Sequence, residues 1–174
     1  SDDIDDYTDI NLQNNEETTD SGAFINFVEE LSYGSESVID VDSLLRYMSV
    51  SVSLANLDSY HGTLAHNYYI YDQDGVFTLL PWDFNEAFGT FNMGCRADVR
   101  GLYIDEPTSG ALADRPMLAN VFANSDHLAI YHDYLWQLID GPLSNDNFTN
   151  RVKTLADLID EHVANDPTAF YGYS

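Results

Sequence analysis

The sequence predicts an α+β fold that is mostly helical and contains one β-hairpin. Two aromatic and aliphatic runs, Tyr68–Tyr71 and Val76–Leu80, flank the turn residues Asp72–Gly75. An Asp-Gly turn between such runs is a strong hairpin signal. Apolar residues also recur at helical spacing on both sides of this hairpin. With 174 residues and 44% hydrophobic residues, the chain can bury a core of its own, and it contains no internal repeat.

Two helices are expected ahead of the hairpin. Residues 1–20 are acidic and rich in amides and threonine, so we expect a loosely packed lead-in there. Ser21 is placed to cap a helix that runs to Leu31. Asp40 is placed to cap a second helix, from Val41 to about Leu57, whose wide apolar face suits the centre of a core.

After the hairpin the chain is irregular and then helical again. Residues 84–114 lack sustained periodicity, and so long an irregular stretch is more often functional than idle. Three helices should follow, the last of them capped by Ser144 or Asn145: Pro116–Ala123, Asp126–Ile139 and Asn145–Asn165. A stripe on the last helix predicts core packing by Phe148, Leu155, Leu158 and Ile159. Pro167–Tyr173 is expected to form one more short helical turn.

The composition is strongly acidic, with 30 Asp and Glu against 6 Lys and Arg and a formal net charge of −24. That charge argues against nucleic acid and against an anionic membrane as partners, because no basic surface is available to replace counterions. It is typical of a secreted, salt-exposed or cation-binding protein. No run of about 18 apolar residues is present that would span a bilayer. Cys95 is the only cysteine, so no internal disulfide is possible.

The two open ends of the hairpin carry side chains suited to a metal ion. Asn67 precedes the first strand, and Asp83 follows the second in Pro81-Trp82-Asp83. Because a hairpin brings its outer ends together, Asn67 and Asp83 are expected to lie close in space. Amide and carboxylate oxygens are ligands that Mg²⁺ prefers. Asp58, which precedes Asn67 by nine residues, is then placed to act as a base.

The order of an acid, an Asn, a hairpin and a second acid is the order in which protein kinases present their catalytic base and two magnesium ligands. A kinase has four residues between the first Asp and the Asn. This chain has eight. In the structural alternative, Asp58 caps a turn, Asn67 begins a strand and Asp83 caps the segment that follows.

Several segments, in the same order, resemble the spore-coat protein H (CotH) kinase-like family. They are Val38–Tyr47, Asn56–Tyr60, His66–Tyr69, Pro81–Asp83 with Phe88-Gly89, and Asp114–Leu118. The resemblance implies an atypical protein-kinase-like fold, ATP and Mg²⁺ as cofactors, and phosphate transfer to Ser or Thr of a protein substrate. It carries Asp58 over as the catalytic Asp and Asp83 as the metal-binding Asp. Asn67 follows as a second metal ligand from the kinase order.

The chain departs from that family pattern in two places. Many members have a second Asp two residues after the first, where this chain has Asn85, so metal binding is weakened or shifts to Asn67. No lysine precedes Asp58 to contact phosphates, and the only base there, Arg46, is expected to pair structurally. The chain also begins abruptly, without Met or a signal peptide. We therefore expect residues 21–174 to be a C-terminal lobe, with the N-terminal lobe upstream, supplied elsewhere or lost.

Several further residues near these motifs admit two interpretations. Trp82 either stacks on an adenine or fills the hairpin end as a buried side chain. His61 and His66 either bond to Asp58 or a phosphate, or pin the loop. The bases Arg96, Arg100 and Arg115 either bind phosphate or an acidic substrate segment, or pair with neighbouring acids, which we favour for Arg115. Those acids are Asp98, Asp105 and Asp114.

Two functions from different classes fit these features. The first is the catalytic lobe of a CotH-like Ser/Thr kinase with Asp58, Asn67 and Asp83 at its centre. The second is a non-catalytic, acidic extracellular module for binding or assembly, which Asn85 and the missing lysine favour. Either function suits an extracellular, cell-surface or spore-coat location.

Overall fold

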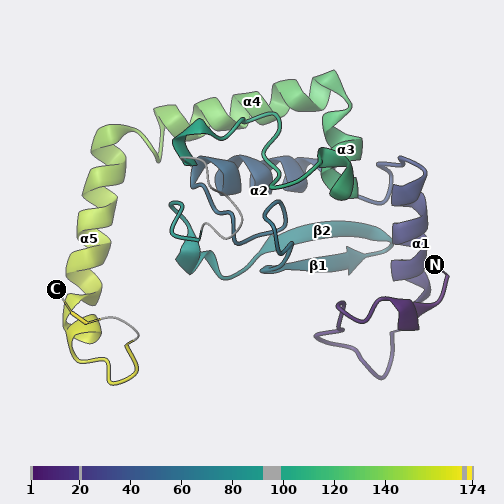
Figure 1. The fold of residues 1–174 in the computed structure, drawn as a ribbon, viewed down its shortest axis with the longest axis horizontal. Coiled ribbons are helices and arrows are strands. Elements are labelled where there is room, and N and C mark those ends of the chain that lie inside the picture. The colour runs from purple at the N-terminus through teal and green to yellow at the C-terminus, as the bar shows by residue number, and fades with distance from the viewer. Residues whose placement is uncertain (1, 20, 92–98, 170–171, 174) are drawn as a thin grey trace. The chain divides into compact units, whose positions relative to one another are not determined.

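A computed structural model describes residues 2–19, 21–91, 99–169, 172 and 173 (Figure 1). Cys95, Arg96 and Asp98 lie outside these residues, as does the side chain of Arg100. The chain divides into two compact units, residues 1–134 and 135–174. The expected class is confirmed, because the regular structure is mostly helical and the sheet found in the described part of the chain is one antiparallel hairpin.

The predicted hairpin is present and consists of β1 (Tyr68–Gln73) and β2 (Val76–Pro81). Its register pairs Gln73 with Val76 at the turn and Tyr68 with Pro81 at the open end. Asp74 and Gly75 both have positive φ, 55° and 84°, which is the conformation that a tight two-residue hairpin turn needs. Gly75 N–H also donates to Asp72 Oδ1 at 2.8 Å. The turn interpretation of Asp72–Gly75 is therefore confirmed.

Helix α2 (Val41–Ser53) is the central core helix and is joined at its start to β2. Asp40 Oδ1 accepts a hydrogen bond from Ser43 N–H at 3.1 Å, so Asp40 is the predicted cap. The backbone just before the helix also pairs with β2. Phe77 N–H donates to the Val38 carbonyl at 2.8 Å, and the Phe77 carbonyl accepts from Asp40 N–H at 2.9 Å. This short parallel bridge fixes the helix against the hairpin.

The predicted end of α2 at about Leu57 is wrong, because the helix stops at Ser53. Ala55 has a left-handed backbone (φ 46°), and Asn56 N–H turns back to the Ser51 carbonyl at 2.8 Å. The residues that follow therefore form a loop rather than a last helical turn, and this loop carries Asp58.

Helix α1 (Gly22–Ser32) begins and ends within one residue of its expected bounds. Ser21 precedes it but makes no side-chain capping bond, so the predicted capping role is wrong. Phe27 of α1 stacks on Phe77 of β2 with ring centroids 4.2 Å apart. The lead-in contains one 3₁₀ turn, η1 (Ile4–Asp6), and is otherwise mostly exposed, as expected.

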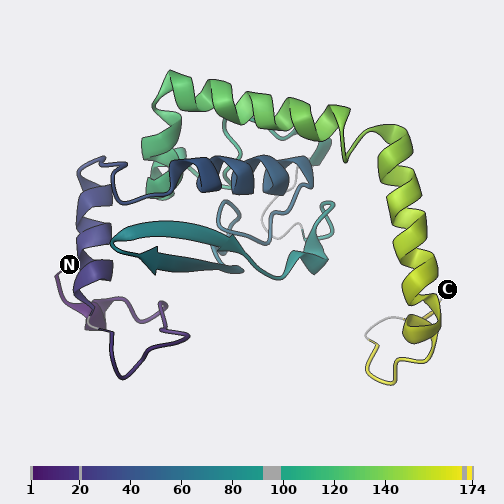
Figure 2. The same ribbon diagram turned by 180° about the vertical axis from the view of Figure 1, so that it is seen from behind.

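Residues 84–114 form no long element in their described part, only the 3₁₀ turns η2 (Phe84–Glu86), η3 (Val99–Gly101) and η4 (Leu112–Asp114). Helix α3 (Pro116–Phe122) follows and is largely buried, and its Asn120 side chain donates to the Leu31 carbonyl at 2.9 Å. Helix α4 (Ser125–Asp140) comes next. Figures 1 and 2 show α2 between α4 and the hairpin, and Tyr134 of α4 bonds to Asp42 of α2.

The second unit contains helix α5 (Asn145–Ala164), as predicted. The prediction that its apolar stripe is core is wrong, because no residue of α5 is buried and Leu158 is 69% exposed. Ser144 precedes the helix but makes no side-chain capping bond. The described residues within 167–173 form turns and no helix, so that expectation is also wrong. Within the described chain, no helix is both long and apolar enough to cross a membrane.

Candidate functional site

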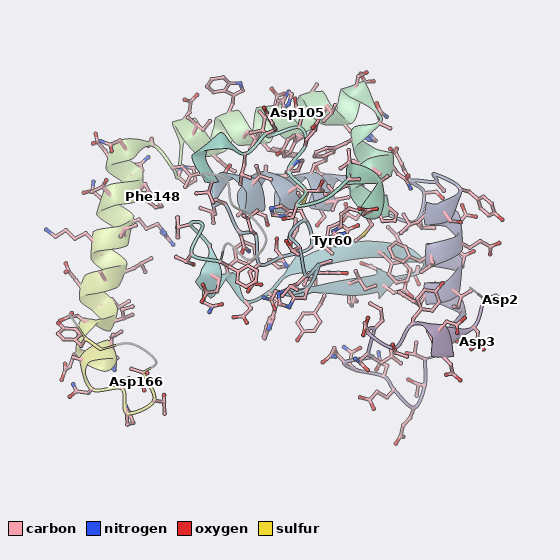
Figure 3. All side chains as sticks on the ribbon, in the orientation of Figure 1. Asp2, Asp3, Tyr60, Asp105, Phe148 and Asp166 are labelled. Atoms are coloured by element: carbon pink, nitrogen blue, oxygen red, sulfur yellow. The ribbon has the colours of Figure 1, made fainter. Side chains whose placement is uncertain are left out.

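The loop between α2 and β1 is buried throughout Leu57–Gly62, which is unusual for a connection. Buried backbone groups need hydrogen-bond partners, so such a loop keeps its shape only where neighbouring elements supply them. Gly62 packs so closely that a Cβ atom there would lie 1.7 Å from the Leu57 carbonyl oxygen. Figure 3 labels Tyr60, which lies in this loop, and its ring meets Tyr68 of β1 edge-on with centroids 5.2 Å apart.

The Asp58 carboxylate is held by two residues that precede β1. Its side chain is only 10% exposed. One oxygen, Oδ1, bonds to His66 Nε2, and the other, Oδ2, accepts from Asn67 Nδ2 at 2.9 Å. Asn67 Nδ2 also donates to the Asp58 backbone carbonyl at 3.1 Å. An ionised carboxylate only accepts hydrogen bonds, so these contacts orient both of its oxygens and leave lone pairs for one more proton.

Asn67 therefore has a role that differs from simple strand initiation. Its amide nitrogen is used by Asp58, whereas its Oδ1 accepts no hydrogen bond from the described residues. The backbone of Asn67 is left-handed (φ 55°), a conformation that Asn tolerates better than most residues. The amide oxygen thus remains available to a cation.

Asp83 and Asn67 flank the open end of the hairpin. Asp83 lies two residues after Pro81, and Asn67 lies one residue before Tyr68, the partner of Pro81. Asp83 is exposed and left-handed (φ 52°), and it caps nothing through its side chain. With its nitrogen turned toward Asp83, the Asn85 amide donates to Asp83 Oδ1 at 2.8 Å and to the Asp83 carbonyl at 3.2 Å. Asn85, two residues after Asp83, is thus a donor that orients the Asp83 carboxylate.

The residues on either side of Asp83 differ in their surroundings. Trp82 is 56% exposed and meets the Tyr69 ring edge-on at 5.2 Å, so the interpretation as a buried hairpin-end side chain is wrong. The Phe84 ring meets the ring of the buried Tyr47 edge-on, with ring centroids 6.4 Å apart. Trp82 therefore offers an open aromatic face next to Asp83, and Phe84 joins the same turn to α2.

The two histidines that flank the loop have different partners. His66 bonds to Asp58, which is one of the two possibilities that the sequence left open. His61 is 1% exposed, and its Nδ1 pairs with Ser59 Oγ at 2.9 Å. Burial, together with the positive charge of Arg115, lowers the pKa of His61 to about 4. His61 is therefore neutral at physiological pH and serves as part of the loop's interior.

Arg115 pairs with no carboxylate of the described residues, Asp105 and Asp114 among them, so the pairing favoured for it is not found there. Its guanidinium donates to three backbone carbonyls: Tyr60 at 2.7 Å, Gly62 at 2.5 Å and Asp114 at 3.0 Å. Arg46 does pair with an acid as expected, because it reaches Asp42 at 2.8 Å on the surface of α2.

Left-handed residues gather around the site. Outside glycine they include Ala55, Ala65, Asn67, Asp83 and Phe88. Such conformations are strained for alanine and phenylalanine and persist only where surrounding contacts enforce them. Phe88 N–H, for example, donates to the Leu54 carbonyl at 2.6 Å. Nothing in the residue types predicts this feature, since it depends on contacts between distant segments.

The arrangement suits a carboxylate base beside a small oxygen-ligand site. Magnesium is commonly held by one or two protein oxygens, with water and phosphate completing its shell. Asn67 and Asp83 carry such oxygens, and they flank the open end of the hairpin, one residue before Tyr68 and two residues after Pro81. Among the described residues, no three His, Cys, Asp or Glu side chains gather as a closed metal site would require.

Comparison with known proteins gives one family and no individual relative. A family model described as CotH kinase protein matches residues 2–174. No curated protein and no solved structure matches the chain. The match covers the α2 segment, the buried Asp58 loop, the hairpin and the Asp83 turn together. On that match, which spans nearly every residue, the chain belongs to the CotH kinase family.

Proposed function

We propose that this chain carries the base and the metal-binding half of a phosphoryl-transfer centre that moves the γ-phosphate of ATP to Ser or Thr of a protein substrate. The observation that carries the proposal is the Asp58 carboxylate, buried and held by His66 and Asn67. A base that must meet a substrate hydroxyl in one geometry benefits from such fixed orientation.

Asp58 accepts the proton of the attacking hydroxyl as that oxygen bonds to the γ-phosphorus, and the bond to the bridging oxygen breaks to release ADP. Asn67 Oδ1 and the Asp83 carboxylate would hold Mg²⁺, which supplies charge neutralisation to the phosphates when bound. Asn85 keeps the Asp83 carboxylate in one orientation by donating to Oδ1. Trp82, exposed beside Asp83, presents a face on which adenine stacks.

The test is phosphate transfer from labelled ATP with Mg²⁺, measured on the protein and on two variants. Asp58→Asn and Asp83→Asn should each lower kcat by about 100-fold or more, because a general base or a metal ligand is lost. Asp74→Asn is the matched control, since Asp74 lies at the opposite end of the hairpin in a left-handed turn that Asn also tolerates. Full activity in Asp83→Asn would refute the assignment.

A non-catalytic binding or assembly module is the second candidate, and Asn85 favours it by occupying the position of a second metal ligand. The acidic composition, 30 acids against 6 bases, suits an extracellular or surface location in either case. Calorimetry of ATP with and without Mg²⁺ separates the two functions. A binding module should release no heat that depends on the metal, whereas the enzyme should bind ATP in a metal-dependent way.

A further inference from the structure

A segment that follows the hairpin, residues 104–115, contacts three successive carbonyls of the Asp58 loop. Arg115 Nε donates to the Tyr60 carbonyl at 2.7 Å, and Arg115 Nη2 donates to the Gly62 carbonyl at 2.5 Å. Between them, Ser109 N–H donates to the His61 carbonyl at 3.0 Å. We call residues 104–115 the brace segment.

The brace segment is itself attached to helices at both ends. Tyr131 of α4 donates its hydroxyl proton to the Ile104 carbonyl at 2.9 Å, and His132 Nε2 lies 2.5 Å from Asp105 Oδ1. Figure 3 labels Asp105, which lies beside α4. At the other end, Pro116 begins the buried helix α3 directly after Arg115. The segment therefore joins the loop to two helices of the core.

We propose that Arg115 is a positioning residue for the Asp58 carboxylate, acting through the backbone of the loop. This inference rests on the proposed function. The N–H donors of a planar guanidinium have fixed relative positions, so two carbonyls bonded to it are held at a fixed separation. A lysine ammonium does not impose such a separation. The carbonyls of Tyr60 and Gly62 belong to buried residues, which leaves them few other donors.

The position of Gly62 is transmitted to Asp58 by direct packing. Gly62 N–H donates to the Ser59 carbonyl at 2.9 Å, and the Gly62 backbone lies against the Leu57 carbonyl. Because a Cβ at Gly62 would lie 1.7 Å from that oxygen, the two backbones lie close together on this side, and a shift of Gly62 toward Leu57 must move Leu57. Leu57 directly precedes Asp58. Loss of the Arg115 hydrogen bonds to Tyr60 and Gly62 should therefore displace the Asp58 carboxylate, although no group that touches this carboxylate is removed.

Hydrogen exchange and kinetics on the whole chain test this role. In Arg115→Lys, exchange of the amides in residues 56–62 and at Ser109 should accelerate by about tenfold or more, while that of β1 and β2 stays unchanged. The same variant should lower kcat by about 10- to 100-fold and leave the KM for ATP within about twofold. Arg46→Lys is the matched control, because Arg46 bonds to an exposed carboxylate on α2, and it should change neither quantity.

Arg115→Gln, which keeps one amide donor without charge, is measured in parallel so that a folding defect in one variant does not end the test. Unchanged exchange in the loop, or equal acceleration throughout the chain, would overturn the positioning role. The two proposals fail separately: full activity in Asp83→Asn refutes the proposed function, whereas the exchange pattern, which requires no phosphate transfer, decides whether Arg115 holds the loop.

Discussion

Gly62 has a steric role that can be tested without any activity. A methyl group at this position would lie 1.7 Å from the Leu57 carbonyl oxygen, far inside contact distance. Gly62→Ala should therefore destabilise the fold by roughly 3 kcal/mol, as other forced rearrangements of buried backbone do. Urea denaturation measures the change. Gly101→Ala is the control, because no atom of the described residues beyond its chain neighbours lies within 4 Å of a Cβ there, and an equal loss in both variants would contradict the prediction.

His61 makes the stability of the loop depend on pH. Burial, with Arg115 nearby, lowers its pKa in the folded state to about 4, below the ordinary value of 6.5. The unfolded chain therefore binds more protons between these values, so stability is complete above about pH 6.5 and falls as the pH drops towards 4. The loss should reach roughly 3 kcal/mol at the low end.

The urea midpoint of His61→Gln, measured from pH 7 to pH 4, isolates this contribution from that of the many carboxylates. The variant should lose less stability over that range than the unmodified protein. His162→Gln, at an exposed position on α5, should follow the unmodified curve. Parallel curves for all three proteins would show that protonation of His61 does not oppose folding.

The sequence suggested which side chains to consider for the site, but not which hydrogen bonds they make. From the order of Asp58, Asn67 and Asp83 along the chain we expected a base and two metal ligands, and these roles stay predictions. That order does not predict that Asn67 donates to Asp58 while Asn85 donates to Asp83, because these bonds depend on backbone angles at positive φ. Arg115 was expected beside an acid because charge is visible in a sequence, whereas the two buried loop carbonyls that it bonds, those of Tyr60 and Gly62, are not.

At the level of elements, two of the candidate helix caps, Asp40 and Ser21, differ in their contacts and can be compared by experiment. Asp40 accepts from Ser43 N–H at 3.1 Å, whereas Ser21 makes no side-chain capping bond. Asp40→Ala should cost about 1 kcal/mol of stability, and more if the 3.4 Å contact with Thr78 also contributes. Ser21→Ala should cost almost nothing. Thermal unfolding of both variants checks this difference, and similar losses would contradict it.

The elements were predicted well where local chemistry determines them. The Asp-Gly turn fixes the hairpin register, and the bounds of α3, α4 and α5 match the apolar periodicity within two residues. The end of α2 was missed because Ala55 turns left-handed, which its residue type disfavours. The α5 stripe was assigned to the core because periodicity reports an apolar face and not what covers it.

For the whole molecule, the net charge of −24 makes stability sensitive to ionic strength. Repulsion among acids opposes the compact state, and raising salt from about 10 to 150 mM shortens the screening length from roughly 30 to 8 Å. The urea midpoint at pH 7 should therefore rise over that range. Sodium chloride and tetramethylammonium chloride should act alike, since screening does not require a bound cation. A rise with one cation only would indicate specific binding instead.

The bridge between Ile39 and Phe77 has a consequence for the order in which the molecule folds. Asp58, His66 and Asn67 all lie on the stretch of chain that this contact closes into a ring. Closing a long ring is an entropic cost that local contacts cannot offset early, so such steps tend to limit the folding rate. We expect the Asp58 loop to acquire its shape only after β2 has met the start of α2. A kinetic intermediate, if one is populated, would then possess the hairpin before it possesses the site.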